Sequence, residues 1–236
     1  MTIKTILFDL DGTLLPMDQE VFIKYYFGAL VKHMEPEGYE PKKLIDSIWK
    51  GTEAMVKNRS SMTNEQVFWD KMKEFYGDSV MKDLPKFEEF YKTSFQNISA
   101  VCPLDPESAP LIKQLKEQGY QLILATNPIF PAIATNSRIR WGNLNPEDFD
   151  LVTTYENSSR AKPNPEYFQE ILEKLNLNPE ECLVVGNDMT EDLCASKIGL
   201  PVFIRTVHLI NKESLSLDEV LHGDFEQLID FLDNIS

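Results

Sequence analysis

The sequence predicts an α/β fold in which a mainly parallel sheet, covered by helices, is interrupted by an α-helical insertion. From residue 106 onward, short apolar runs alternate with helical segments, the order that right-handed crossovers between parallel strands require. Between about residues 18 and 97, apolar residues recur only at helical spacing, without strand-like alternation. A chain of 236 residues is long enough to bury a Rossmann-like core together with such an insertion.

The first predicted element is a buried strand at residues 6–8, which ends in the motif Asp-Leu-Asp-Gly-Thr at residues 9–13. Ligands of open α/β sheets bind beyond the carboxyl ends of the strands, so Asp9 and Asp11 are expected at the rim of the sheet. Their spacing of two directs both side chains to one side of an extended backbone, close enough to share a metal ion. Gly12 permits the turn and brings a backbone N–H near a bound anion.

Two other interpretations of this motif are weaker. In a calcium-binding loop, Asp9, Asp11 and Glu20 would occupy the first, third and twelfth positions, but the sixth position needs glycine and is Leu14 here. A solvated Asp-Gly turn is the other interpretation, and the strand immediately before the motif counts against it.

The helical spacing between residues 18 and 97 predicts about four helices, with breaks at 35–38, 58–61 and 77–85. Aromatic residues inside these helices, such as Trp49 and Phe68, are expected to form a local core. The predicted division is therefore a helical cap at residues 17–98 and an α/β core at residues 1–16 and 99–236.

The second part of the chain predicts the remaining strands and helices of the core, with Gly119 closing the first helix. Strands are expected at 120–125, 150–154, 181–185 and 202–204. Helices are expected at 108–118 and 224–231, together with one that ends at about 141 and one that begins at 164. Because strand ends of a parallel sheet converge on one edge, polar residues that follow these strands could line one pocket with Asp9 and Asp11. They are Thr126, Asn127, Asp188 and Asp192, with Lys162 preceding the helix from 164.

Composition and charge limit the classes of partner. The formal net charge of −15 argues against nucleic-acid binding, which relies on clustered Lys and Arg, although a metal ion could still attract a small anion into one pocket. Three cysteines without metal-ligand spacing indicate buried thiols of a reducing compartment. No segment resembles a secretion signal or a membrane span, so a cytoplasmic location is expected. The oligomeric state stays open.

With these motifs in this order, the whole chain resembles the haloacid dehalogenase superfamily, specifically its members with a helical cap between the first and second motifs. The resemblance rests on residues 9–13, on Thr126 at a strand end, on Lys162 followed by Pro163, and on the acidic strand end around Asp188. It implies a Mg²⁺-dependent phosphatase of a small phosphorylated metabolite, acting through a phospho-aspartyl intermediate. By the same resemblance, Mg²⁺ would take a side-chain oxygen of Asp9 and the backbone carbonyl of Asp11.

The residue types agree with that chemistry. Asp9 beside a divalent cation would stay ionised and attack phosphorus, while Asp11 would give a proton to the leaving group and later take one from water. Thr126 and Asn127 would donate to the phosphoryl oxygens, and Lys162 would balance their charge.

Three expectations remain open. The chain has Gly186-Asn187-Asp188 where the commoner family pattern has Gly followed at once by Asp, so either Asn187 or Asp188 would hold the metal. A carboxylate attracts Mg²⁺ more strongly than an amide, which favours Asp188, and Asp192 on the same face of a helix could orient it.

In the loop at 58–61, Arg59 could bind a second charged group of the substrate, or could be an ordinary solvated arginine.

Two alternative functions use the same fold. A sugar-phosphate mutase would return the phosphoryl group to a second hydroxyl, and a non-catalytic binding or regulatory module would have no such transfer. A dehalogenase would lack the second acid that Asp11 provides. The sequence does not name the substrate, because cap loops set selectivity and vary freely.

Overall fold

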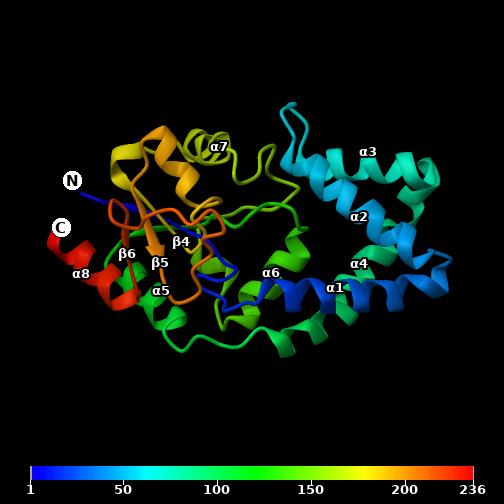
Figure 1. Cartoon of the computed structure of the whole chain (residues 1–236), viewed down its shortest axis with the longest axis horizontal. Helices are drawn as coiled ribbons and strands as arrows, with labels where there is room; N and C mark the ends of the chain where they lie inside the picture. The colour runs from blue at the N-terminus through cyan, green and yellow to red at the C-terminus, as the bar shows by residue number, and fades with distance from the viewer. Residues whose placement is uncertain (1, 236) are drawn as a thin grey trace.

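The computed structural model describes residues 2–235, which form a six-stranded parallel sheet with helices on both faces (Figure 1). The strands lie in the order β3-β2-β1-β4-β5-β6, and every pairing between neighbours is parallel. This is the doubly wound α/β fold that the sequence predicts. The strands are β1 (Thr5–Phe8), β2 (Gln121–Leu124), β3 (Leu151–Val152), β4 (Cys182–Gly186), β5 (Val202–Arg205) and β6 (Leu221–Gly223).

Strand β1 lies at the centre of the sheet, between β2 and β4, where the direction of chain progression reverses. Its last residue, Phe8, pairs with Leu124 of β2 and Val185 of β4. All four residues of β1 are buried, as expected for a strand covered on both faces. The carboxyl end of β1 is therefore the switch point of the sheet, where doubly wound folds bind ligands.

Alternate residues of β1 face two different apolar layers. Ile6 and Phe8 belong to a cluster that includes helices α5 and α8 and continues into the helical insertion, whereas Leu7 packs with helix α7. Figure 1 accordingly shows α7 on one side of the sheet and α5 and α8 on the other. The helices of the core are α5 (Ser108–Glu117), α6 (Ala132–Trp141), α7 (Glu166–Leu175) and α8 (Phe225–Ile235).

The segment between β1 and α5 is helical throughout its regular structure, as predicted. Figure 1 shows it at one end of the molecule, with β6 and α8 at the other. The breaks fall where Pro, Gly and polar residues predicted them: Asp18 and Thr63 cap helices α1 and α3, and Gly38 adopts φ 90° after a 3₁₀ turn. The helices are α1 (Gln19–Met34), α2 (Pro41–Val56), α3 (Asn64–Tyr76) and α4 (Leu84–Lys92), with 3₁₀ segments at Glu35–Glu37, Asp78–Asp83 and Ser94–Val101.

A buried asparagine fastens the insertion to the core. The Asn64 amide nitrogen donates to the carbonyls of Pro128 (3.2 Å) and Arg160 (3.1 Å), and its oxygen accepts from Asn58 (3.1 Å). The backbone N–H of Asn64 also donates to the carbonyl of Ser158. Because Asn64 is fully buried, these bonds fix the start of α3 relative to the carboxyl edge of the sheet.

Strand β6 (Leu221–Gly223) is the one strand of the described residues that the sequence analysis does not predict. It is a three-residue edge strand whose Leu221 and His222 are exposed, so it carries neither an apolar run nor an alternating pattern. The three cysteines are buried and unpaired, as predicted. None of the helices in residues 2–235 has the length and apolar character needed to cross a membrane.

Candidate active site

A cavity of about 510 Å³ lies between the helical insertion and the carboxyl ends of β1, β2 and β4. Its floor is polar, although its other walls are mainly apolar. The predicted convergence of the strand ends is therefore present in the structure. The floor is lined by Asp9, Asp11, Thr126, Asn127, Asn187, Asp188, Glu191 and Asp192.

Lys162 lies beneath this floor and bridges two carboxylates. Its Nζ donates to Asp9 Oδ1 at 2.8 Å and to Asp192 Oδ1 at 2.6 Å, and its side chain is 1% exposed. The hydroxyl of Thr13 donates to the other oxygen of Asp9 at 3.3 Å. The Asp9 carboxylate is thus held from both sides at the end of β1.

Burial and neighbouring charges have opposing effects on the pKa values of Asp9 and Lys162. Burial raises the pKa of Asp9 to about 8; Lys162 lowers it, while Asp192 and Asp11 raise it. Burial lowers the pKa of Lys162, but attraction to Asp192 and Asp9 outweighs burial and holds that pKa well above its usual value. Lys162 therefore remains a cation, and Asp9 needs further positive charge to be fully ionised at neutral pH.

Asp192 organises the loop after β4, although Asp188 and Asp192 do not lie on a helix, the arrangement in which their spacing would place them on one face. Residues 189–192 form turns after an isolated β-bridge between Asp188 and Ile210, and a 3₁₀ helix begins only at Leu193. The Asp192 carboxylate folds back, and its Oδ2 accepts the backbone N–H groups of Asn187 and Asp188, both at 3.0 Å. A Cβ on Gly186 would lie 2.1 Å from this carboxylate, so Gly186 is required for the close approach. Asp192 orients the backbone of the two candidate metal ligands rather than sharing a helix face with Asp188.

Asn187 and Asp188 differ in what their side chains contact. The Asn187 amide oxygen shares the hydrogen of the Thr13 hydroxyl with Asp9 (3.2 Å), and its nitrogen donates to the His208 carbonyl (2.6 Å), so both ends have protein partners. Asp188 Oδ1 accepts the N–H groups of Thr190 (2.7 Å) and Glu191 (2.9 Å). Its Oδ2 accepts no hydrogen bond from residues 2–235. Asp188 thus keeps an oxygen available in the cavity.

Asp11 is paired with an arginine that the sequence analysis does not identify. Arg138, on α6, donates from Nη1 to Asp11 Oδ2, and its guanidinium lies 4.6 Å from the centre of the Phe130 ring. Arg138 is 1% exposed, whereas the neighbouring Arg140 on the same helix is exposed. The sequence of α6 gives no signal that separates these two arginines. The other oxygen of Asp11 is buried without a partner among the described residues.

The carboxyl end of β2 contributes hydrogen-bond donors, one of which contacts Glu191, an acid that the sequence does not single out. Within the described part of the chain, the Thr126 hydroxyl has no protein partner, while its carbonyl accepts from Thr153 and Tyr167. Asn127 Nδ2 donates to Glu191 Oε2 at 3.1 Å. Burial, opposed by Lys162 and Asn127 and supported by Asp192 and Asp188, raises the pKa of Glu191 to about 7.

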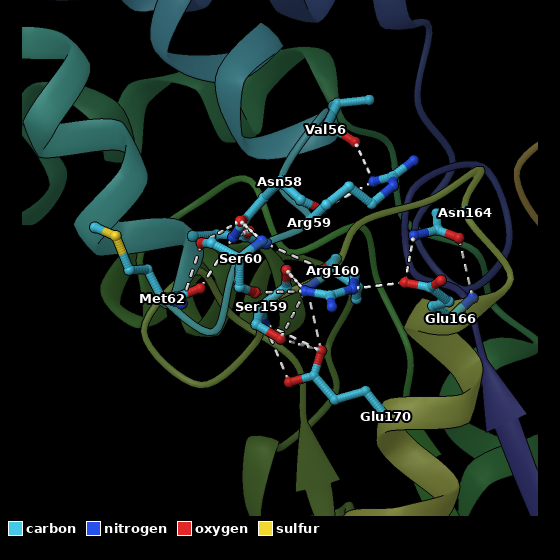
Figure 2. Close-up of polar contacts among 11 residues, drawn as sticks. Val56, Asn58, Arg59, Ser60, Met62, Ser159, Arg160, Asn164, Glu166 and Glu170 are labelled. Carbon is cyan, nitrogen blue, oxygen red and sulfur yellow. Dashed lines mark hydrogen bonds and ion pairs between the residues drawn. The ribbon is translucent and has the colours of Figure 1, made fainter.

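The structure does not bring two of the predicted binding residues to the cavity. Gly12 adopts φ +88°, but its N–H donates to the carbonyl of Leu15 (2.7 Å), and the Asn187 amide covers its Cα. Arg59 is exposed and donates to the carbonyls of Val56 (3.4 Å) and Asn58 (2.8 Å), as Figure 2 shows. Neither residue lines the cavity.

A different arginine bridges the cap and the core near Arg59. Arg160 donates to the Ser60 carbonyl at 2.7 Å and to Glu166 at 2.8 Å, and Figure 2 shows both contacts. Arg160 therefore joins the loop between α2 and α3 to helix α7. The interaction is structural, because Arg160 is also absent from the cavity wall.

The charge of the floor is appropriate for a divalent cation. Five carboxyl groups, Asp9, Asp11, Asp188, Glu191 and Asp192, face two cations, Lys162 and Arg138. All candidate donors are oxygens, which Mg²⁺ prefers. Residues 2–235 contain no group of three or more His, Cys, Asp or Glu side chains placed to hold a metal. The ligands expected for Mg²⁺ here are different, because they are the carboxylates of Asp9 and Asp188 and the backbone carbonyl of Asp11.

Comparisons with known proteins agree with this fold. The sequence pattern of a hydrolase family, described as haloacid dehalogenase-like hydrolase, matches residues 3–197. The pyrophosphatase PpaX of Bacillus cereus (strain G9842) is 28% identical over 189 residues, covering 80% of this chain and 76% of that protein. A HAD phosphatase from Thermococcus onnurineus superposes with a TM-score of 0.58 at 21% identity over 98% of both chains. A 2-haloacid dehalogenase from Pseudomonas syringae pv. Tomato DC3000 superposes with a TM-score of 0.65 at 18% identity over 100% of both chains.

Proposed function

Because this chain belongs to the haloacid dehalogenase-like hydrolase family, we propose that it is a Mg²⁺-dependent phosphatase of a small phosphorylated metabolite, with Asp9 as the nucleophile. The single observation that supports it most is the arrangement around Asp9. A carboxylate at the switch point of the sheet is held by Lys162 and Thr13 and faces a cavity of about 510 Å³. In this proposal residues 17–98 are the cap, and residues 1–16 and 99–236 are the catalytic core.

The first half of the reaction transfers the phosphoryl group to the enzyme. An Asp9 oxygen forms a bond to phosphorus while the bond from phosphorus to the ester oxygen breaks, and Asp11 donates its proton to that oxygen. The Thr126 hydroxyl, which has no partner in the described residues, and the amide of Asn127 donate to the phosphoryl oxygens. Lys162 balances the negative charge from below.

The second half releases phosphate. Asp11 takes a proton from water, the water oxygen bonds to phosphorus, and the bond from phosphorus to Asp9 breaks. Arg138 fixes the direction of the Asp11 carboxyl by donating a hydrogen bond to its Oδ2. Asp11 and Asp9 therefore have different partners, which agrees with their different roles.

Mg²⁺ fits the excess of carboxyl groups, and Asp9, the Asp11 carbonyl and Asp188 are the groups that would hold it. When bound, the ion supplies positive charge that keeps Asp9 ionised and neutralises the phosphoryl oxygens. The buried, unpaired cysteines support the cytoplasm as the location of the enzyme.

The test of this proposal is a hydrolysis assay with phenyl phosphate. We expect phosphate release with Mg²⁺ and its loss after thorough chelation. Undiminished turnover after chelation would exclude the metal assignment. Transfer of the phosphoryl group to a second hydroxyl of a sugar phosphate, in preference to water, would instead indicate a mutase. No phosphoryl transfer at all would leave the binding-module interpretation.

Variants of the loop after β4 should identify the metal ligand. We expect Asp188→Asn to raise the Mg²⁺ concentration needed for half-maximal activity by about tenfold or more, because it removes the available carboxylate oxygen. Asn187→Ala should change this concentration less, since the Asn187 amide is already bonded to Thr13 and His208, although it should lower the melting temperature. A Mg²⁺ titration with the reverse order would assign the ligand to Asn187.

A further inference from the structure

We propose that the cap selects phosphate monoesters whose alcohol is bulky and apolar and carries no second negative charge. This proposal rests on the proposed phosphatase function, and it names the substrate class of the same site. It is carried by two independent properties of the cavity, the chemistry of its walls and the sign of its charges.

The walls above the polar floor are largely aromatic. Helix α1 provides Phe22 and Phe27, helix α2 provides Trp49, helix α3 provides Phe68, and the segment before α6 provides Phe130. Trp49 and Phe27 lie with their ring centres 5.4 Å apart, and Trp49 is still 47% exposed. These rings offer a large apolar surface to an alcohol that extends from Asp9 toward the cap.

The walls of the cavity carry acidic side chains, and its one cationic side chain among the described residues is already paired. Among the described residues that line the cavity, Arg138 is the only cation, and its guanidinium is paired with Asp11. Three further carboxylates line the cavity: Glu65 and Glu88 come from the cap, and Glu156 comes from the segment after β3. Burial is the main cause of the raised pKa of Glu65, and the neighbouring Glu156 carboxylate adds to it.

A leaving group with its own carboxylate or phosphate would therefore lose water without gaining a cationic partner, and would also approach like charges. An apolar group has no such cost and gains contact with the rings. The two properties together disfavour pyrophosphate and anionic phosphoesters as substrates.

Three aryl esters with related leaving groups test the proposal: phenyl phosphate, 2-naphthyl phosphate and 4-carboxyphenyl phosphate. We expect kcat/KM for 2-naphthyl phosphate to exceed that for phenyl phosphate by about fivefold or more, since the larger ring contacts more of the wall. The carboxylate should lower kcat/KM by about tenfold relative to phenyl phosphate. Pyrophosphate should be a poorer substrate than phenyl phosphate.

Two variants test the residues. Trp49→Ala should remove most of the preference for the naphthyl over the phenyl ester, whereas Tyr25→Ala should preserve it. Tyr25 is a matched control, because it is 51% exposed on the cap and does not line the cavity. Glu65→Gln should raise kcat/KM for 4-carboxyphenyl phosphate relative to phenyl phosphate, because it removes a like charge.

The outcomes separate this inference from the function on which it rests. If phenyl phosphate is hydrolysed but the carboxylated ester or pyrophosphate is used equally well or better, the selectivity is overturned and the phosphatase function stands. An unchanged naphthyl preference in Trp49→Ala would also overturn it. If none of the esters is hydrolysed, the phosphatase function is overturned, and the selectivity with it.

Discussion

Replacing Asp9 by asparagine should lower the turnover of phosphate esters by at least about a thousandfold, because the amide cannot attack phosphorus. The fold should be preserved, since the asparagine oxygen can still accept from Lys162 while its amide nitrogen donates to the Thr13 hydroxyl oxygen. Steady-state hydrolysis of phenyl phosphate measures the loss. Asp46→Asn, which changes an exposed carboxylate, should leave turnover unchanged.

The same variant should change how stability depends on pH. Burial raises the pKa of Asp9 from 3.8 to about 8, so the folded state binds a proton that the unfolded state has lost. The stability that this proton contributes is fully present below pH 3.8 and is lost as the pH rises through about 8. Without divalent cations, the melting temperature of the wild type should therefore fall relative to Asp9→Asn between pH 5 and 8. A parallel pH dependence of the two proteins, or near wild-type turnover of the variant, would contradict the assigned state of Asp9.

The convergence of Asp9, Thr126 and Asp188 could be predicted from the sequence because it follows from strand order alone. Each residue follows an apolar run, and parallel strands place their carboxyl ends on one edge. Lys162 could be predicted only through its order among the motifs, since a single lysine is usually exposed. The cap could be predicted because its apolar residues recur at helical spacing over some 80 residues.

The pairing of side chains could not be predicted, because it depends on tertiary contacts. Arg138 contacts Asp11 across 127 positions of sequence, and nothing in helix α6 distinguishes it from Arg140. The spacing of Asp188 and Asp192 would place them on one face of a helix, but residues 189–192 form turns, and the Asp192 carboxylate folds back onto the backbone N–H groups of residues 187 and 188. Asp side chains can bond to the nearby backbone in this way, and the residue spacing alone does not show which arrangement is adopted.

The second large effect is expected for Lys162→Met, which removes the cation between two buried carboxylates. Asp9 and Asp192 would keep their hydrogen bonds to Thr13 and to the backbone but lose their shared cation, and breaking a buried ion pair in this way costs about 3–5 kcal/mol in the free energy of unfolding. Turnover should fall by at least about a hundredfold, because Lys162 also balances the charge of the transferred phosphoryl group. Urea unfolding and phenyl phosphate hydrolysis measure the two losses. Lys57→Met, at an exposed ion pair of the cap, should change neither.

A double variant separates the structural role of Lys162 from its role in the reaction. The double variant Lys162→Met/Asp192→Asn also removes one of the two buried carboxylates that would otherwise lack a cation, so much of the lost stability should return. The asparagine oxygen can still accept the N–H groups of Asn187 and Asp188, which keeps the loop after β4 in place. Turnover should remain low, because no cation faces Asp9 and the phosphoryl group. If turnover returned together with stability, Lys162 would act only by holding the loop, and charge balance during transfer would have to come from elsewhere in the site.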